Sequence, residues 1–578
     1  MNHSQMVQCT LKTLSALLCF AGMAMLHAQD MDRYRPDVEK NSRDGTVKIN
    51  TDPAPATASD EMILDSLKGL VLMPADTDAV QQTLESEGLI IHKLPILEKK
   101  DIQDTLQGYL NKPVSMQDLQ SIRLDIIKYY RNQNRPVVDV IIPEQDVTNG
   151  VVQMRIMEAS LGKITIKGNE HFSTDMLRNY LSFSEGDYVQ QGQLHLDNNA
   201  LNYNPFRSAS LSLRKGSEPG TADLEVNVRD QRPWRVYAGY ENSGSENVSE
   251  NRFFAGFNWG NAFKQDGVLS YQYTQGEEFD TINAHSLTYS MLTRDKHEIS
   301  IFGSYSETEP DANTINIEGE SVQVSGRYEM PVLLESGTPI NFEFGIDYKN
   351  TNNTIEFGGA PLSDDDVDTL QGLVGVNGEF SDSYGVTYAS ANVFYSPGGL
   401  LGSNDTSDFR RFRAQAESEY FYFRGEVDRR TDLQGRFNLQ SNAIAQFSTE
   451  NLLPAEQMNM GGYNTVRGYE ENEINGDNGF FISNQLEYGP FSVTNGKFFG
   501  QRDLVTAYVF WDYANVWDTN EPTGQDTDAE LHSIGPGFRL RLGKHVTARF
   551  DWGFQLEDSG QSQTGDDNRA HVGVTVSY

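Results

Sequence analysis

Cysteine is almost absent from this chain of 578 residues: its two copies, Cys9 and Cys19, both fall within the first 28 residues. The rest of the chain therefore has no disulfide, no thiolate nucleophile and no cysteine-ligated zinc. After residue 28 there is also no run of about 18 apolar residues, which excludes a polytopic helical membrane protein. Basic residues are few, 46 against 82 acidic ones, so binding of nucleic acid through a basic face is not expected.

The common signatures of enzymes are missing as well. The chain has no GxxxxGK[ST] phosphate loop, no HExxH zinc motif and no GxSxG serine elbow, and its ten histidines are scattered. The acidic run Asp364–Asp368 offers carboxylates to calcium, but a solvated loop is the better interpretation. We therefore predict a protein that is not an enzyme, has no catalytic or metal-binding residues and needs no cofactor.

The first 28 residues have the three parts of an export signal. A polar start carries Lys12, the apolar stretch Leu14–Leu26 follows, and Ala28 precedes a polar sequence. The apolar stretch is too short to span a bilayer, so a cleaved signal peptide is predicted over 1–28. Residues 29–60 are polar and end in TDPAPATASD, which predicts a linker without a core of its own.

Residues 61–231 carry a mixed α/β pattern that occurs twice. In the first copy, 61–159, a strand precedes a helix that Ser115 can cap, with Asp118 as its capping-box partner, and two strands follow. The second copy, 160–231, has a strand, two helical stretches and a closing hairpin. Two interpretations stay open: two ordinary α+β domains, or two docking modules whose free sheet edges receive an extended peptide.

From 232 to 578 the hydrophobic period becomes two. Of 61 aromatic residues, 50 lie from Pro233 onward, and apolar and polar side chains alternate. We count about sixteen such segments, many of about 10–14 residues, which is long enough to cross a bilayer at a tilt. Acidic, turn-rich stretches such as LSDDDVD (362–368) are expected to separate them. Strands of a β-sandwich, the alternative, are usually shorter, about 5–6 residues.

Three lumen-facing arginines are interpreted as hydrated wall charges: Arg539, Arg541 and Arg549.

We therefore predict a mainly β fold, a 16-stranded transmembrane antiparallel β-barrel that follows the two α+β modules. One long connection, 450–479, interrupts the strands; loops of this length are usually functional or disordered. It carries Arg467 in the tetrapeptide VRGY. In VTAYVFWDYANVW, alternation directs Phe510 and Asp512 into the lumen. If the loop folds inward, Arg467 and Asp512 can form a charge-assisted pair; an extracellular loop with an incidental arginine is the alternative.

Together, the signal segment, the two modules, the strand-rich region, VRGY in the long loop and FWDYA in a later strand resemble a known family. It comprises the outer-membrane transporters of two-partner secretion (TpsB, ShlB/FhaC/HecB type), in the superfamily that includes BamA. PEQDVTNGVVQMRIMEASLG (143–162) and NPFR (204–207) are similar to parts of the family's two POTRA (polypeptide-transport-associated) domains. The most specific stretch is LLPAEQMNMGGYNTVRGYEENEINGDNGFFISNQLEY (452–488), and the resemblance covers essentially the whole mature chain.

The resemblance implies roles for particular residues. Arg467 of the loop motif is expected to pair with Asp512 of the inner-wall motif and so to hold the loop inside the barrel. Tyr578 takes the place of the terminal aromatic residue that the barrel-assembly machinery reads. Residues 29–60 stand where many members carry a plug helix, although no strong amphipathic pattern is present. The matching motif residues are Val466, Arg467, Gly468 and Tyr469 in the loop, and Phe510 and Asp512 on the wall.

The resemblance also implies a function and a location. Members of this family pass an unfolded exoprotein that forms a β-helix, such as a haemolysin or an adhesin, from the periplasm to the cell surface without ATP, and some activate it. We therefore expect a pore in the lipid of the outer membrane, with periplasmic POTRA domains that capture the substrate first. A BamA-like assembly factor is the first alternative, and a passive porin or receptor is the second.

Overall fold

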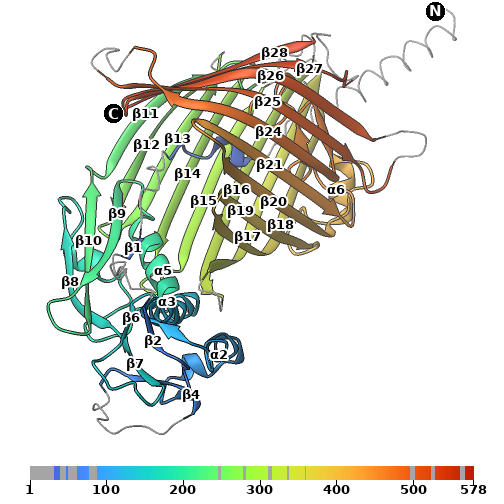
Figure 1. Ribbon diagram of the computed structural model, residues 1–578. Helices are drawn as coiled ribbons and strands as arrows, with labels where there is room; N and C mark the ends of the chain where they lie inside the picture. Colours follow the sequence, from blue (N-terminus) through green and yellow to red (C-terminus); the bar gives the residue numbers. More distant parts are fainter. Residues whose placement is uncertain are drawn as a thin grey trace, which may run out of the picture.

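The computed structural model describes residues 31–38, 47–49, 61–76, 87–244, 249–277, 281–309, 315–334, 338–357, 360–494, 501–521, 527–559 and 567–578. The predicted signal peptide, 1–28, lies outside these residues, as does much of the predicted linker. Two small modules stand at one end of a large barrel (Figure 1). Among the described residues, no helix is both long and apolar enough to cross a bilayer.

The first module is a four-stranded sheet with helices against it. Its sheet order is β4-β3-β7-β6, and the central strand β3 runs parallel to both β4 and β7. Ser115 caps α3 as predicted: its hydroxyl accepts from the Asp118 N–H at 3.2 Å, and the Asp118 carboxylate accepts from the Ser115 N–H at 2.8 Å. The elements are β2 (Met62–Leu64), β3 (Gly69–Pro74), β4 (Gly88–Ile91), η2 (Pro95–Glu98), α2 (Lys100–Gln107), β5 (Val114–Ser115), α3 (Met116–Asn132), β6 (Val138–Ile141) and β7 (Val151–Glu158).

The second module repeats this plan with one strand borrowed from the predicted linker. Its sheet order is β1-β9-β10-β8, and β1 (Val47–Ile49) pairs parallel with β9, Val47 opposite Leu211 and Ile49 opposite Leu213. The elements that follow are β8 (Ser160–Lys167), α4 (Thr174–Arg178), α5 (Gln191–Leu201), β9 (Arg207–Lys215) and β10 (Thr221–Asp230).

Two short segments of residues 29–60, predicted as a linker with a possible plug helix, are ordered in the structure. Val47 and Ile49 pack against the core of the second module, and this tertiary contact stabilises the strand. Three residues are too few for the alternation of a strand to be recognised in the sequence. The other segment is η1 (Met31–Tyr34), a single 3-10 turn inside the barrel. Met31 and Tyr34 are buried there against Ala284 and Phe302.

The barrel closes because its last strand pairs with its first. β28 runs antiparallel to β11, with Ser577 opposite Tyr237, which gives the sixteen antiparallel strands that the alternation predicted. The strands are β11 (Trp234–Glu241), β12 (Arg252–Ala262), β13 (Gly267–Gly276), β14 (Ile282–Leu292), β15 (Glu298–Thr308), β16 (Ile315–Leu333), β17 (Pro339–Phe357), β18 (Ala360–Asp382), β19 (Gly385–Pro397), β20 (Glu419–Asp432), β21 (Phe437–Ser448), β24 (Asn478–Phe491), β25 (Asp503–Trp517), β26 (Ala529–Leu542), β27 (Val546–Gln555) and β28 (Asn568–Ser577).

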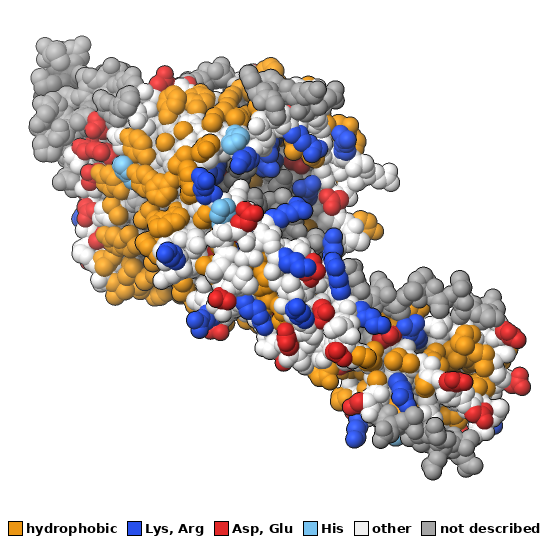
Figure 2. Space-filling view, turned by 90° about the vertical axis from the view of Figure 1, so that its left-hand side faces the viewer, with side chains coloured by type: hydrophobic (Ala, Val, Ile, Leu, Met, Phe, Trp, Pro, Cys, Tyr) orange, Lys and Arg blue, Asp and Glu red, His pale blue; other side chains and the backbone are white. Residues whose placement is uncertain are grey.

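Side chains alternate between the two faces of the barrel wall. On β25, Val509 is 54% exposed on the outer surface, whereas Phe510 is 2% exposed. Figure 2 shows the hydrophobic side chains gathered over the outer wall of the barrel. Closure leaves no free sheet edge, so the barrel satisfies its backbone hydrogen bonds within the wall, and the β-sandwich alternative is excluded.

One predicted loop is part of a strand instead. The acidic stretch 362–368 lies inside β18, which is 23 residues long. Neighbouring side chains explain how the strand accommodates its charges: the Asn350 amide on β17 donates to Asp366 at 2.6 Å and to Asp368 at 3.0 Å. Cross-strand hydrogen bonds therefore stabilise a row of aspartates within the strand, whereas turn propensity alone predicts a loop there.

The second module docks on short turns at one end of the barrel. Arg207, at the start of β9, forms an ion pair of 2.6 Å with Asp266 in the turn between β12 and β13. Lys296, in the turn between β14 and β15, contacts Asp197 of α5 at 2.7 Å. The modules therefore lie at the end of the barrel that carries the turns β12–β13 and β14–β15, and the connection between β21 and β24 starts from the opposite end.

Candidate functional site: the inward loop and its anchor

The connection between β21 and β24 folds back into the barrel. We call residues 449–477 the inward loop; it contains a small hairpin of β22 (Met458–Met460) and β23 (Ile474–Gly476). Val466 and Tyr469 are fully buried in a cluster with side chains of the wall strands β24, β25 and β26. The wall members of this cluster are Phe481, Ala514, Val516 and Leu531.

Arg467 and Asp512 meet in a bidentate ion pair. Nε of Arg467 lies 2.8 Å from Oδ2 of Asp512, and Nη2 lies 2.8 Å from Oδ1. The backbone N–H of Arg467 also donates to Oδ2 at 3.1 Å. Asp512 is completely buried and Arg467 is 5% exposed. This fork-to-fork geometry fixes the orientation of the loop as well as its attachment.

The guanidinium of Arg467 has further partners on the wall. Nη1 lies 3.2 Å from Asp551 on β27 and donates to Gln485 on β24 at 2.8 Å. The ring of Phe510 stacks under the guanidinium carbon, 3.6 Å from the ring centroid. One arginine thus contacts two carboxylates and one aromatic face, which is the arrangement that offsets the cost of burying its charge.

The glycine of the motif packs directly on the backbone of β27. Gly468 has φ +99°, and a Cβ built on it would lie 2.8 Å from the carbonyl carbon of Gly553. The Gly468 N–H donates to Nε2 of His571 at 3.0 Å, and its carbonyl accepts from Gln555 at 2.8 Å. Both the positive φ and the close approach require glycine here. The Tyr469 hydroxyl donates to the carbonyl of His532 at 2.9 Å.

Sequence reasoning missed several of these wall residues. Arg549 was interpreted as a hydrated wall charge, but it forms an ion pair with Asp551 and stacks on Tyr463 of the inward loop, 4.0 Å from the ring centroid. Alternation along β27 places Asp551 and Gly553 on the lumen face. It cannot say which lumen residues the loop reaches, because that depends on the path of the loop.

Tyr578 lies apart from this site, at the end of the barrel that faces the modules. It is 76% exposed, and its backbone pairs with Val236 of β11. Its ring lies 6.2 Å from Trp234 and 6.3 Å from His545. The structure therefore brings together the loop and wall motif residues and leaves Tyr578 at the rim.

Substitution of Gly553 by alanine is expected to loosen the inward loop. The added Cβ would lie 2.5 Å from the Cα of Gly468, and such overpacking costs about 1–3 kcal/mol. Introducing Val466→Cys as a reporter is simple because residues 29–578 contain no cysteine. Gly553→Ala should raise its labelling rate by a membrane-impermeant maleimide by about fivefold to a hundredfold, since labelling follows the opened population.

Gly326→Ala is the matched control for this labelling experiment. Gly326 also lies within a barrel strand, β16, but its Cβ would meet only Ile346 at an ordinary 3.6 Å. Equal labelling rates in the Gly553 and Gly326 variants would contradict the tight packing of the loop on β27.

Comparison with known proteins agrees with this architecture. Residues 220–540 match the family model described as haemolysin secretion/activation protein ShlB/FhaC/HecB. Residues 88–159 match a POTRA domain of ShlB type, and residues 159–231 match the POTRA family described as surface antigen variable number repeat. The two modules are therefore POTRA domains, POTRA 1 and POTRA 2 in chain order.

Curated relatives and solved structures point the same way. The heme/hemopexin transporter protein HuxB of Haemophilus influenzae is 22% identical over 459 residues, which are 76% of this chain and 77% of HuxB. The outer membrane transporter CdiB of Dickeya dadantii is 21% identical and covers 68% of this chain and 70% of its own. The solved structure of CdiB from Escherichia coli superposes with a TM-score of 0.70 at 14% identity, covering 92% of this chain and 93% of that one.

The likeness to solved CdiB shows the fold, and the family model covers more than half of the chain, including the inward loop and its anchor on β25. The chain belongs to the haemolysin secretion/activation family ShlB/FhaC/HecB, a family of outer-membrane transporters with periplasmic POTRA domains.

Proposed function

We propose that this protein exports one cognate exoprotein across the outer membrane by two-partner secretion. The observation that carries the proposal is the inward loop, locked by Arg467 and Asp512 inside a closed barrel that has two POTRA domains at its periplasmic mouth. A barrel with a buried, ion-paired loop is a gated path rather than an open porin. The relatives HuxB and CdiB are transporters by name, which favours export over the BamA-like alternative.

The substrate we propose is an unfolded polypeptide that later forms a β-helix, such as a haemolysin or an adhesin. Strand addition to a POTRA sheet suits such a chain, because an extended segment can pair with an edge strand through its backbone. β4 and β6 are the edge strands of POTRA 1, and β8 is one edge of POTRA 2. Folding outside the cell would then pull the chain outward without a nucleotide.

The domain boundaries and the roles of single residues are part of the same proposal. The domain bounds would be 1–28 for a cleaved signal peptide, 61–159 for POTRA 1, 160–231 for POTRA 2 and 232–578 for the barrel. Arg467 and Asp512 would hold the gate, and Tyr578 would be read by the barrel-assembly machinery during insertion. Outer-membrane lipid would surround the apolar band, and no step would be enzymatic.

Deletion of 61–159 tests the proposal. Export of the cognate exoprotein is expected to fall to background, because POTRA 1 and its strand edges are lost while the contacts of POTRA 2 with the barrel remain. Immunoblots of the surface and periplasmic fractions measure export. Heat-dependent migration in gels reports on barrel folding, and an unchanged barrel is the control. Normal surface delivery by the shortened chain would refute a capture role for POTRA 1.

A further inference from the structure

A second segment packs inside the extracellular end of the barrel. We call residues 398–418, between β19 and β20, the outer loop; it carries α6 (Thr406–Phe412), which lies at the end of the barrel away from the POTRA domains (Figure 1). Phe409 and Phe412 are 0% and 3% exposed. They are buried in one apolar cluster with Ala416 of the same loop and with side chains of the wall and of the inward loop: Val367, Leu373, Phe394, Tyr420, Tyr422, Leu452 and Leu453.

Arg413 ties this outer loop to the inward loop. Its guanidinium donates to both oxygens of Asp477, at 2.6 Å and 3.2 Å, and Nη1 also donates to the carbonyl of Leu452. Asp477 is completely buried at the end of the inward loop and accepts from the Leu452 N–H at 2.9 Å. The inward loop is therefore held at its extracellular end by an ion pair whose cation belongs to the outer loop.

The same arginine reaches a third extracellular segment. Nη2 of Arg413 lies 2.6 Å from Asp518, which begins the connection between β25 and β26. The Thr519 N–H donates to Asp477 at 3.0 Å. Arg413 thus lies between two carboxylates from two different segments, so its removal leaves both of them without this cation and costs far more than loss of an exposed pair.

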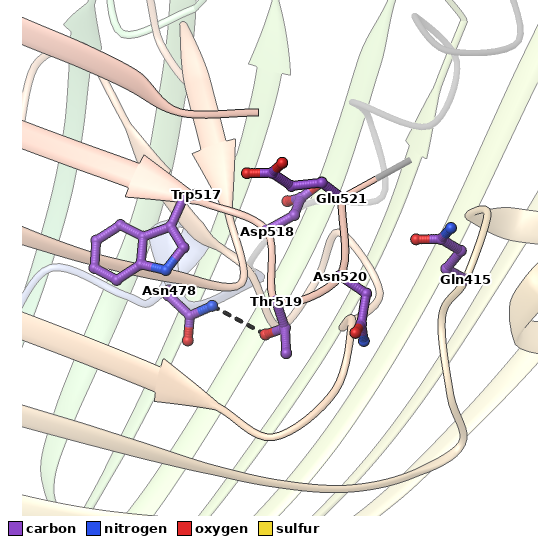
Figure 3. Close-up of a pocket in the computed structure, with 7 residues that line it drawn as sticks. All are labelled: Gln415, Asn478, Trp517, Asp518, Thr519, Asn520 and Glu521. Carbon is purple, nitrogen blue, oxygen red and sulfur yellow. Dashed lines mark hydrogen bonds between the residues drawn. The ribbon is translucent and has the colours of Figure 1, made fainter. Parts of the chain in front are cut away.

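Beside this junction the mouth is hollow. Residues Trp517–Glu521, Asn478 and Gln415 line a cavity of about 810 Å³. Figure 3 shows Trp517–Glu521 along one side, with Gln415 of the outer loop across from them. Asn478 donates to Thr519 at 2.9 Å on the near wall. Side-chain packing therefore leaves space between the outer loop and the connection after β25, and the Arg413 ion pairs bridge these two segments.

We infer that Arg413 is a positioning residue for export: it latches the outer loop onto the inward loop and so keeps the extracellular mouth closed at rest. This inference rests on the proposed function. The barrel wall is closed, so a chain leaving through the lumen must pass the end of the barrel where Phe409 and Phe412 pack between the inner wall and the inward loop. Leu452 and Asp477 belong to the inward loop, hence movement of that loop withdraws two of the three groups that Arg413 contacts, leaves it only Asp518, and loosens the outer loop in the same step.

Conductance of the purified full-length protein in planar lipid bilayers, without any substrate, tests the latch. Arg413→Gln is expected to raise the open probability by about tenfold, a common size for coupling between sites. Arg413→Lys keeps the charge but loses the planar fork, so it should give an intermediate value. Arg411→Gln is the matched control from the same outer loop, because the Arg411 side chain is 55% exposed. Equal conductance in the Arg413→Gln variant and the unmodified protein would overturn the inference.

A crosslink covers the case in which Arg413→Gln fails to fold. Gln415→Cys and Glu521→Cys can be joined across the cavity by a long, reducible bismaleimide, since the mature chain has no cysteine of its own. The bridge should stop export of the exoprotein, and reduction should restore it; export that continues through the bridged mouth would overturn the latch. If the unmodified protein exports nothing although Arg413→Gln opens the pore, the proposed function fails and the latch stands.

Discussion

Substitution of Arg467 by alanine is expected to reduce surface delivery of the exoprotein by about a hundredfold or more, with the barrel still inserted. The loss of this arginine leaves Asp512 and Asp551, both completely buried, without their shared cation. Breaking a buried pair costs about 3–5 kcal/mol. Once the arginine is removed, water in the lumen can hydrate the two carboxylates. We therefore expect the free-energy cost to displace the loop more than to unfold the barrel. Asp512→Ala should have the same phenotype.

Two further variants make this test specific. Arg541→Ala removes an exposed arginine of β26 and should leave export unchanged. Arg467→Lys keeps the charge but not the bidentate fork or the stacking on Phe510, 3.6 Å away, so only partial export is expected. Immunoblots of surface fractions give the export, and heat-dependent gel migration gives the folded barrel. If Arg467→Ala and Asp512→Ala both export normally, the pair has no role in gating.

The wall residues Phe510 and Asp512 could be predicted from sequence because successive side chains of a strand point to opposite faces. Once the outer face of β25 is known, Phe510 and Asp512 must face the lumen. Alternation also directs the partners on β27 and β28 into the lumen, but nothing in the sequence says that the loop reaches them. Asp551, Gly553 and His571 contact the loop only because it crosses the lumen along one path, and that path depends on tertiary packing of Val466 and Tyr469.

The elements that sequence analysis missed are short ones stabilised by their surroundings. α6 has seven residues, too few for a helical period to show, and its Phe409 and Phe412 are ordered by a cluster from distant strands. β1 and η1 are likewise three and four residues long. By contrast, long segments with a sustained period, such as α3 and the barrel strands, were predictable because each buries one continuous face.

A buried ion pair joins POTRA 2 to the barrel, and breaking it is expected to have a large effect on the docking of that domain. Arg207 and Asp266 have side chains 0% and 1% exposed, and their charged atoms are 2.6 Å apart. The Tyr180 hydroxyl donates to Asp266 at 2.9 Å. Burial, together with the charge of Asp266, raises the pKa of Tyr180, so the phenol stays protonated and remains a donor. Asn204 donates to the same carboxylate at 2.8 Å.

Asp266→Asn is expected to destabilise this joint by about 3–5 kcal/mol, because it leaves the buried Arg207 charge without a counter-charge. Asparagine is the right substitution, since Asp266 has φ +59° and asparagine tolerates this left-handed conformation. Trypsin cleavage between POTRA 2 and the barrel in outer-membrane vesicles should accelerate by about a hundredfold or more, as cleavage follows the undocked population. Lys264→Asn, in the same turn at the same φ, is the control and should not change cleavage.

The double variant Arg207→Met, Asp266→Asn distinguishes the attraction between the two charges from the free-energy cost of leaving one buried charge unpaired. Removing both charges together is often nearly neutral, whereas removing one is not. The double variant should therefore be cleaved more slowly than Asp266→Asn alone and should recover part of its export. If it is cleaved as fast as the single variant, the attraction between Arg207 and Asp266 itself holds POTRA 2 on the barrel, and packing around Phe172 and Tyr180 contributes little.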